Sequence, residues 1–367
     1  MRQALKDVWA VDSNFVKRGE QYLEEGDLLI SSANSWNLVG KCSWVPKLSE
    51  PATFGGFVTA LRGDSCTIDR RYLYRWFSMP QTQETVRSFS RQTTNIANLD
   101  LKRCADLKVP LPPLPEQKRI AAALDQVDVL RAKRCQAIAL LDDLTQSVFL
   151  DMFGTENPDW PEVTVEELAQ DRKGSIRTGP FGSQLLHEEF TDSGIPVLGI
   201  DNAVHNEFRW GERRYITEEK YEQLKRYTVL PGDVLITIMG TCGRCAVVPD
   251  DIPTAINTKH LCCITLDRTK CHPEFLHSYF LLHPASRSYL TRTAKGAIMS
   301  GLNMGIIKEL PVKLPPLSLQ QRYVDELSQI RSSRAFHERH LAAVSELFAS
   351  LQQRAFSGTL WDHETAA

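Results

Sequence analysis

The residues best suited to bind a metal are cysteines in the second half of the chain. Cys242 and Cys245 form a Cys-x-x-Cys pair, and Cys262-Cys263 and Cys271-His272 follow it. Thiolates and imidazoles at such spacings are typical of a structural zinc site. The related stretch Gly40–Cys42 has no second cysteine nearby, although a site needed by a repeated fold should recur. We therefore predict no metal and interpret these cysteines as small buried or turn residues.

The glycine-rich stretch "TGPFGS" at Thr178–Ser183 is the other segment that could carry chemistry. It lacks the Lys-Ser/Thr ending of a phosphate-binding loop, and its glycine spacing differs from that of a dinucleotide-binding turn. With no other catalytic motif in the sequence, we predict no catalytic centre. A free-standing enzyme is thus the least favoured class.

Length and composition indicate a globular protein of two or three domains. The chain has 367 residues, of which 42% are hydrophobic and 24% charged, enough to bury separate cores. No stretch approaches the ~20 apolar residues of a membrane span, and the N-terminus lacks the apolar core of a signal peptide. Nine scattered cysteines do not indicate a disulfide framework. We predict a cytoplasmic protein with reduced thiols.

Charge is distributed unevenly although the formal net charge is only −2. The stretch 69–103 has seven basic and three acidic residues, and the stretch 285–308 has four basic and no acidic residues, so each carries +4. Two basic stretches at matching places predict two surfaces that face a polyanion such as nucleic acid. The alternative is that both are ordinary solvated faces.

The basic stretches match because the chain repeats itself with an offset of 203 residues. "LPPLPEQKRI" at Leu111 corresponds to "LPPLSLQQRY" at Leu314, and Gln117 corresponds to Gln320. Nearer the N-terminus, "EGDLLIS" at Glu25 resembles "PGDVLIT" at Pro231 with an offset of 206. Such long-period similarity predicts two structural units of one pattern.

Each Pro-Pro-Leu stretch is expected to lead into a long helix. Pro115 suits the first turn and Ser318 an N-cap, and no further Pro or Gly follows until Gly154 or Gly358. Both helices carry a 4-3 apolar spacing that is interrupted at Arg131 and Arg134, and at Arg334 and His337. Its apolar members are Ile120, Leu124, Val127, Ile138, Leu141, Val148, Leu327, Ile330, Leu341, Val344 and Leu351.

This heptad stripe predicts that the two helices form an antiparallel coiled coil. About 35 residues at ~1.5 Å each would make a rod ~50 Å long, with a globular unit expected at either end. The alternative is two amphipathic helices that pack on separate cores.

The fold class predicted is α+β, with two α+β domains in tandem repeat separated by the long helices. The boundaries are 1–110 for the first domain, 111–154 for the first helix, 155–313 for the second domain and 314–367 for the second helix and tail. Val- and Ile-rich runs such as Asp233–Met239 and Leu261–Leu266 read as short strands. About fifty residues of the second unit, including "RTGPFGSQLL", have no counterpart in the first, which predicts either a lost sheet edge or a late start.

With the repeat, the "LPPLPEQKRI" helix start and "RTGPFGSQL" in view, the whole chain resembles the specificity subunit of type I restriction–modification systems. The resemblance implies two target-recognition domains that read the halves of a split DNA site, and paired helices that fix the spacer between them. It implies partners: double-stranded DNA, two modification (methyltransferase) subunits and restriction subunits. No cofactor is implied for this chain, whereas the methyltransferase partners would use S-adenosylmethionine.

The resemblance does not make the chain itself a methyltransferase. An adenine methyltransferase grips its target with an Asn/Asp-Pro-Pro-aromatic loop, whereas Leu111–Leu114 and Leu314–Leu317 flank their prolines with leucines. We interpret both Pro-Pro pairs as residues that mark the start of a helix.

Candidate DNA-contacting residues are polar and lie in loops at matching places, because Arg and Lys hold phosphates or guanine and Gln and Asn pair with adenine. For each, the alternative is an ordinary surface loop. As a whole-chain alternative, the protein is a coiled-coil scaffold whose DNA recognition is degenerate. The candidates are Lys41, Arg91, Gln92, Thr93, Thr94 and Asn95 in the first unit, and Arg177, Ser183, Gln184, Arg244, Lys295, Gly296, Ser300 and Asn303 in the second.

Overall fold

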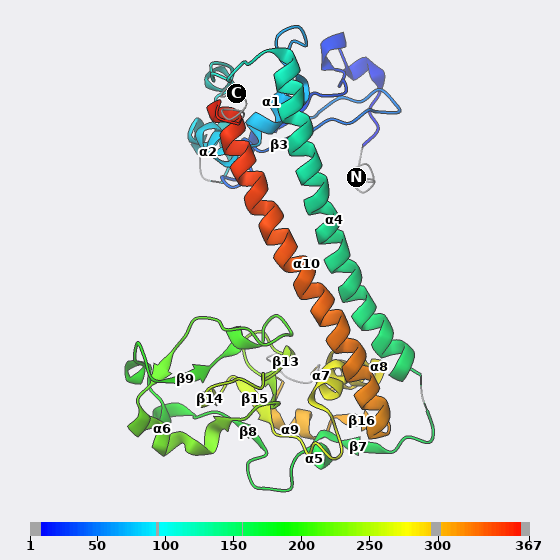
Figure 1. The fold of residues 1–367 in the computed structure, drawn as a ribbon, viewed down its shortest axis with the longest axis vertical. Coiled ribbons are helices and arrows are strands. Elements are labelled where there is room, and N and C mark those ends of the chain that lie inside the picture. Colours follow the sequence, from blue (N-terminus) through cyan, green and yellow to red (C-terminus); the bar gives the residue numbers. More distant parts are fainter. Residues whose placement is uncertain (1–8, 93–94, 156, 295–301, 361–367) are drawn as a thin grey trace, which may run out of the picture. The chain divides into compact units, whose positions relative to one another are not determined.

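The computed structural model describes residues 9–92, 95–155, 157–294 and 302–360 (Figure 1). The chain divides into two compact units: unit 1 comprises Met1–Gln136 and His337–Ala367, and unit 2 comprises Ala137–Phe336. Two long helices, α4 (Leu114–Phe153) and α10 (Leu317–Ser357), contribute a segment to each unit. Within the described ranges, no helix has the length and apolar character needed to cross a membrane.

Unit 1 is built on a three-stranded antiparallel sheet in the order β3-β1-β4. The buried side chains of its central strand, Leu28 and Ile30, pack on Tyr72 and Phe77 of the helix that follows the sheet. The strands are β1 (Leu28–Ser31), β3 (Cys42–Trp44) and β4 (Val58–Leu61), and the helices are α1 (Arg70–Phe77), α2 (Pro80–Ser88) and α3 (Leu101–Ala105). A second small sheet, β2-β6-β5, joins Ala33–Asn34, Ala97–Leu99 and Ser90–Gln92, and two short 3-10 turns, η1 (Ser13–Phe15) and η2 (Gly19–Gln21), precede β1.

Unit 2 contains the same sheet with one more strand, in the order β13-β12-β15-β8, and a second four-stranded sheet, β10-β9-β14-β11. The first sheet comprises β8 (Ile176–Thr178), β12 (Val234–Thr237), β13 (Cys245–Val247) and β15 (Leu261–Ile264). The second comprises β9 (Ile195–Leu198), β10 (Tyr215–Ile216), β11 (Thr228–Val229) and β14 (Ala255–Asn257). A two-stranded ladder pairs β7 (Glu162–Thr164) with β16 (Pro311–Lys313). The helices are α5 (Val165–Leu168), α6 (Glu218–Leu224), α7 (Pro273–Leu282), α8 (Pro284–Ala294) and α9 (Met304–Lys308).

The two units repeat the sheet down to its register. In unit 1, Leu28 of β1 lies opposite Leu61 of β4, and in unit 2 the equivalent Val234 of β12 lies opposite Ile264 of β15. The edge strand β8 has no counterpart in the described part of unit 1. The predicted repeat and the mixed helix and sheet content are therefore confirmed, and in the described residues the sheet of unit 1 lacks the strand equivalent to β8.

A buried carboxylate at the start of the central strand is neutralised in both units, but from different strands. In unit 1, Arg62 donates from Nε and Nη2 to the two oxygens of Asp27, at 2.8 and 2.7 Å. In unit 2, the equivalent Asp233 accepts from Arg177 of β8 at 2.7 Å. Thr265, which occupies the position equivalent to Arg62, accepts a hydrogen bond from the same guanidinium at 2.9 Å. Unit 1, without β8, thus supplies its arginine from the end of β4.

The arginine also keeps Asp27 ionised. Burial alone would raise the pKa of Asp27, but the hydrogen bond from Arg62 and the backbone N–H of Glu24 outweigh burial and hold this pKa below its ordinary value. An unpaired carboxylate at this position would cost far more than the ion pair contributes.

A buried glutamine joins each long helix to the helix of its own domain. In unit 1, the Oε1 of Gln117 accepts from the N–H of Asp69 at 2.8 Å, and Asp69 is the N-cap of α1. The Nε2 of Gln117 donates to the carbonyl oxygens of Pro112 at 2.8 Å and Thr67 at 3.2 Å. One amide thus satisfies three backbone groups and fixes how the chain enters α4.

Unit 2 repeats this joint with the offset of 203. The Oε1 of Gln320 accepts from the N–H of His272 at 2.9 Å, and His272 is the N-cap of α7. The Nε2 donates to the carbonyl oxygens of Pro315 at 2.9 Å and Lys270 at 3.1 Å. The glutamine shared by the two helix starts is therefore a structural feature of the fold.

The heptad positions of α4 and α10 are all buried or half-buried. In unit 1, Ile120 and Leu124 near the start of α4 share a core with Leu351 and Ala355 near the end of α10. The two polar positions are also paired across the helices. In unit 1, Arg131 donates to the Oγ of Ser345 at 3.3 Å and Arg134 lies 3.1 Å from Nδ1 of His337. In unit 2, Arg334 lies 3.1 Å from Asp142.

We expect Gln117→Ala and Gln320→Ala each to lower the free energy of unfolding by about 2 kcal/mol, because each leaves three backbone groups without their partner. Chemical denaturation followed by far-UV circular dichroism measures the loss. Gln126→Ala and Gln321→Ala, which replace exposed glutamines of the same two helices, serve as controls. Equal stability of the buried and exposed variants would contradict the role of the joint.

We also expect unit 2 to lose stability in mild acid. His277 is buried, with Nε2 2.9 Å from the carbonyl oxygen of Asn206 and 3.1 Å from that of Cys245, and burial lowers its pKa to about 4. Because the unfolded chain binds the proton first, stability is full above the ordinary pKa of about 6.5 and falls by up to about 3 kcal/mol as the pH drops toward 4.

Urea denaturation at pH 7.5 and pH 5 tests this expectation. His277→Gln keeps an amide donor near the Nε2 position but cannot bind the proton, so its stability should fall less between the two pH values. An identical fall in the variant and the native chain would show that His277 is not the responsible group.

Candidate nucleic-acid interface

The glycine-rich loop of unit 2 leaves the sheet at the end of β8 and reaches the surface. A Cβ at Gly179 would lie 1.9 Å from the carbonyl oxygen of Asn257, so only glycine lets the chain pass the end of β14. Ser183 and Gln184 are exposed on the short 3-10 turn η3 (Gly182–Gln184). Gln184 accepts a hydrogen bond from the hydroxyl of Tyr227 at 2.8 Å, which fixes the outer end of the loop.

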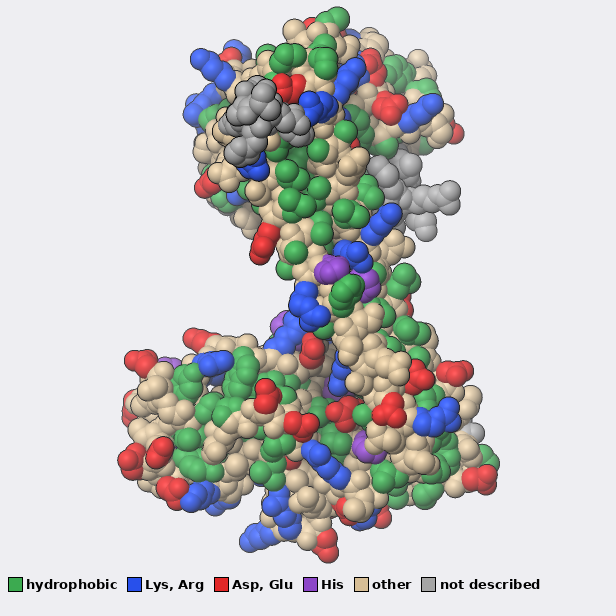
Figure 2. Space-filling model, in the orientation of Figure 1, with side chains coloured by type: hydrophobic (Ala, Val, Ile, Leu, Met, Phe, Trp, Pro, Cys, Tyr) green, Lys and Arg blue, Asp and Glu red, His purple; other side chains and the backbone are tan. Residues whose placement is uncertain are grey.

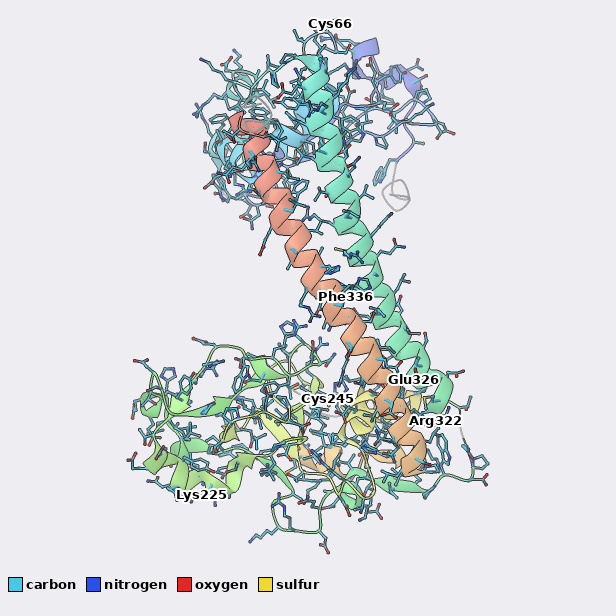
Figure 3. The ribbon with its side chains drawn as sticks, viewed as in Figure 1. Cys66, Lys225, Cys245, Arg322, Glu326 and Phe336 are labelled. Carbon is cyan, nitrogen blue, oxygen red and sulfur yellow. The ribbon has the colours of Figure 1, made fainter. Side chains whose placement is uncertain are left out.

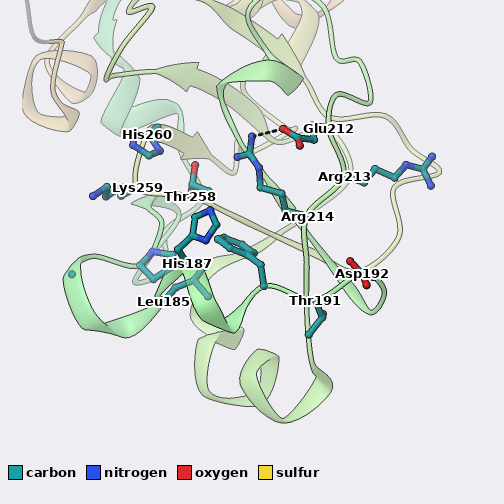
Figure 4. Close-up of a pocket in the computed structure, with 13 residues that line it drawn as sticks. Leu185, His187, Thr191, Asp192, Glu212, Arg213, Arg214, Thr258, Lys259 and His260 are labelled. Atoms are coloured by element: carbon teal, nitrogen blue, oxygen red, sulfur yellow. Dashed lines mark ion pairs between the residues drawn. The ribbon is translucent and has the colours of Figure 1, made fainter.

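Beside this loop lies an open cavity of about 650 Å³ (Figure 4). Segments distant in sequence line it: the loop after β8, the Glu212–Arg214 stretch before β10, and the turn between β14 and β15. Its charged and imidazole side chains are mainly basic, with two acids against five bases and imidazoles. These are Asp192 and Glu212 against His187, Arg213, Arg214, Lys259 and His260.

The basic side chains of the cavity are held in distinct ways. Arg214 pairs with Glu212 at 3.6 Å, as Figure 4 shows, and the guanidinium of Arg213 lies 4.9 Å from the ring centre of Trp210. Burial, together with Lys259 and Arg214, lowers the pKa of His260 below its ordinary value. Its imidazole is therefore neutral at pH 7 and offers one donor and one acceptor.

This cavity combines the kinds of group that proteins use to contact DNA: cations for phosphates or guanine, and a neutral imidazole that can hydrogen-bond to base edges. The sequence predicted DNA contacts for Ser183 and Gln184, on the loop beside this cavity, but gave no indication of Arg213, Arg214, Lys259 or His260, which line it. The Arg213-Arg214 pair was visible in the sequence, but nothing local linked it to the glycine-rich loop.

Arg177, a predicted DNA contact, lies in the interior of unit 2 with 8% of its surface exposed. Its guanidinium donates to Asp233, to Thr265 and to the carbonyl oxygen of Thr228. With the carbonyl oxygen of Gly174, these partners engage both terminal nitrogens, so the placement of Arg177 argues against base contact. The sequence could not show this, because Asp233 lies 56 residues away.

Two other predicted residues of unit 2 are exposed. Arg244 follows Gly243, whose φ of 78° matches the 80° of Gly40 before Lys41, so the same glycine turn presents a cation in both units. Asn303 caps α9 by accepting from the N–H of Ile306 at 3.0 Å, which leaves its amide nitrogen for other contacts. Lys295, Gly296 and Ser300 lie outside the described residues.

In unit 1, the predicted residues gather around α2. The Gly40-Lys41 turn contacts Val86 of α2, and β5 follows α2 with Arg91 and Gln92 exposed. Lys41 and Arg91 thus belong to one region of unit 1. Asn95 is exposed after β5, and Thr93 and Thr94 lie outside the described residues.

The basic stretch 69–103 is less available than its net charge suggests. Arg70 pairs with Glu24 at 3.1 Å, Arg71 with Asp125 at 2.8 Å and Arg75 with Asp128 at 3.0 Å. The first arginine therefore binds an acid near β1, and the other two bind acids of α4. Arg87, Arg91, Lys102 and Arg103 remain as cations of this stretch, and the guanidinium of Arg103 lies 4.2 Å from the ring centre of Phe89.

The clustered cysteines of unit 2 occupy its cores. Cys245, Cys262 and Cys271 are part of one apolar cluster, whereas Cys263 points into another, and Figure 3 places Cys245 inside the unit. Burial raises the pKa of Cys262 and of Cys271 to about 12, which keeps both thiols protonated. Among the described residues, no three His, Cys, Asp or Glu side chains are placed to hold a metal ion.

Comparison with known proteins agrees with this architecture. A family model described as the type I restriction modification DNA specificity domain matches residues 6–139 and 158–346. The specificity subunit of the type I restriction enzyme EcoBI from Escherichia coli is 26% identical over 364 residues, which cover 91% of this chain and 73% of that protein. The EcoKI specificity subunit of Escherichia coli K12 is 23% identical over 387 residues and covers 96% and 79%.

A solved structure shares the fold. The crystal structure of the type I restriction–modification system S subunit from M. genitalium superposes with a TM-score of 0.58 at 14% identity, covering 92% of this chain and 85% of that one. The chain belongs to the family of type I restriction modification DNA specificity domains. Its role is to supply DNA sequence specificity in a type I restriction–modification system, as the resemblance in its sequence predicted.

Proposed function

We propose that this chain reads a bipartite DNA target, with unit 1 and unit 2 each contacting one half of the site. The observation that carries this proposal is the repeat itself: the same sheet, the same glutamine joint and the same glycine turn before a cation (Lys41 or Arg244) occur in both units. Two similar readers on one chain suit two half-sites at a fixed separation. The domain boundaries 1–110, 111–154, 155–313 and 314–367 are part of this proposal.

The groups proposed to touch DNA are polar, and all are exposed except the half-buried Arg214, Lys259 and His260. In unit 2 they are Ser183, Gln184, Arg244 and Asn303, with the cavity residues Arg213, Arg214, Lys259 and His260 added from the structure. In unit 1 they are Lys41, Arg91, Gln92 and Asn95. Arg177 is left out because its guanidinium is engaged in the interior.

The long helices are proposed to form an antiparallel coiled coil that fixes the spacer between the half-sites. Every heptad position is buried or half-buried, and the polar positions Arg131, Arg134 and Arg334 have partners on the other helix; both observations support the coiled coil. The chain is further proposed to scaffold two modification subunits, which supply adenine-N6 methylation with S-adenosylmethionine, and the restriction subunits. EcoBI and EcoKI, whose specificity subunits resemble this chain, are named as type I restriction enzymes.

Methylation mapping in a host that carries this chain and its modification partner tests the scheme. We expect methylated adenines at one motif of two short defined segments separated by an unread spacer. Arg214→Ala or Lys259→Ala should weaken binding of the assembled methyltransferase to that motif about tenfold or more, since a good base or phosphate contact is worth ~1–3 kcal/mol. Lys118→Ala, exposed at the start of α4, is the control.

Binding without sequence preference, or methylation at a single undivided motif, would contradict the proposal and favour a coiled-coil scaffold with degenerate recognition. Methyl transfer by this chain alone would overturn it as well.

The spacer role makes a separate prediction. Deletion of the facing heptads Ile138–Leu144 of α4 and Ile330–Phe336 of α10 keeps the heptad phase and shortens each helix by about 10 Å. We expect the same two half-sites with a spacer about three base pairs shorter, since one turn of ~34 Å holds about ten base pairs. An unchanged spacer in a folded variant would show that the helices do not set it.

A further inference from the structure

Unit 2 has a second basic recess, of about 440 Å³, beside the turn that precedes β8. Arg172 and Lys173 approach it from this turn, and Lys225 and Arg226 approach it from η6 (Lys225–Tyr227), just before β11. All four side chains are exposed, and no acidic side chain of the described chain lines the recess. Figure 3 shows Lys225 at the lower edge of unit 2, and in Figure 2 Lys and Arg side chains project from this edge.

The recess has a fixed floor and free backbone donors. The buried guanidinium of Arg177 lines it and is held by Asp233. The rim is a tight turn, in which the N–H of Ser175 donates to the carbonyl oxygen of Arg172 at 3.3 Å and Gly174 has a φ of 85°. In the described chain the N–H groups of Lys173 and Gly174, at the centre of this turn, have no acceptor. Exposed cations around free N–H groups suit a tetrahedral oxyanion.

The recess adjoins the proposed DNA-reading cavity. Tyr227 lines the recess, and its hydroxyl donates to Gln184 at 2.8 Å. In the sequence, Gln184 lies between Gly182 and Leu185, which both line the cavity. The guanidinium of Arg226 lies 4.8 Å from the ring centre of Tyr227. One continuous surface therefore runs from the glycine-rich loop to the basic recess.

We propose that this recess binds backbone phosphates of the duplex that flanks the half-site read by unit 2. The proposal rests on the proposed function, because that function places DNA in the adjoining cavity. Phosphates are favoured over an acidic protein segment because the recess continues the DNA-reading surface and offers N–H donors as well as cations. Such contacts are independent of sequence and position the domain on its site.

The test compares the native chain with Arg172→Gln/Lys173→Gln/Arg226→Gln, each assembled with the modification subunits. Lys225 is left in place because it also pairs with Glu222. Dissociation constants are measured against salt concentration on a target duplex and on an unrelated duplex. We expect the slope of log K against log salt to become shallower by about two to three on both duplexes, because each phosphate contact contributes ~0.9. The ratio between the duplexes should stay unchanged.

A control variant, Lys108→Gln/Lys118→Gln/Arg322→Gln, removes the same charge at exposed positions elsewhere and should keep the native slope. Trimming the target duplex beyond the half-site of unit 2 should weaken the native complex and the control but leave the triple variant unaffected. A native slope in the triple variant would overturn the phosphate site while leaving sequence-specific binding intact. Loss of assembly with the modification subunits at a native slope would instead assign the recess to a protein partner. Absence of any target preference in the native complex would count against the proposed function, and the slopes would still decide the phosphate site.

Discussion

The structure of each unit depends on one buried amide. Gln117 and Gln320 each join three backbone groups, two before the domain helix and one before the long helix. Because a buried amide tolerates no unpaired donor or acceptor, the joint admits one entry angle for the long helix. The same glutamine fixes the rotation of the long helix about its axis and the orientation of the adjoining domain. Each domain and the start of its long helix therefore form one rigid piece.

Around this shared joint, the two units use different charges. In unit 1, Arg71 and Arg75 of α1 pair with Asp125 and Asp128 of α4. The equivalent positions of unit 2 hold Glu274 and Ser278 on α7, and Ser328 and Arg331 on α10. If α1 packed on the start of α10 instead of α4, these ion pairs could not form, because α10 has no acids at the equivalent positions. The same geometry is kept by hydrogen bonds to backbone, which do not depend on side-chain charge, while each domain remains matched to its own helix.

The loops proposed to face DNA are placed by the sheets and shaped by glycines. Gly179 lets the glycine-rich loop cross the end of β14, and Gly40 and Gly243 turn the chain with positive φ directly before a cation. Rigid strands with small residues at their ends leave the exposed polar side chains free to differ between the units. This division suits the proposed reading of two different half-sites by two units that share one frame.

The sequence by itself determined the repeat, the two long helices and their heptad series, because periodic burial and helix-start signals are local. It also showed that about fifty residues of the second unit, including the glycine-rich loop, have no counterpart in the first. The tertiary structure alone decided which cations are free to contact a ligand. Arg70, Arg71, Arg75 and Arg177 form ion pairs with acids distant in the chain. It also decided that Arg213, Arg214, Lys259 and His260 share one cavity. Charge and spacing are read along the chain, but pairing and burial depend on contacts across it.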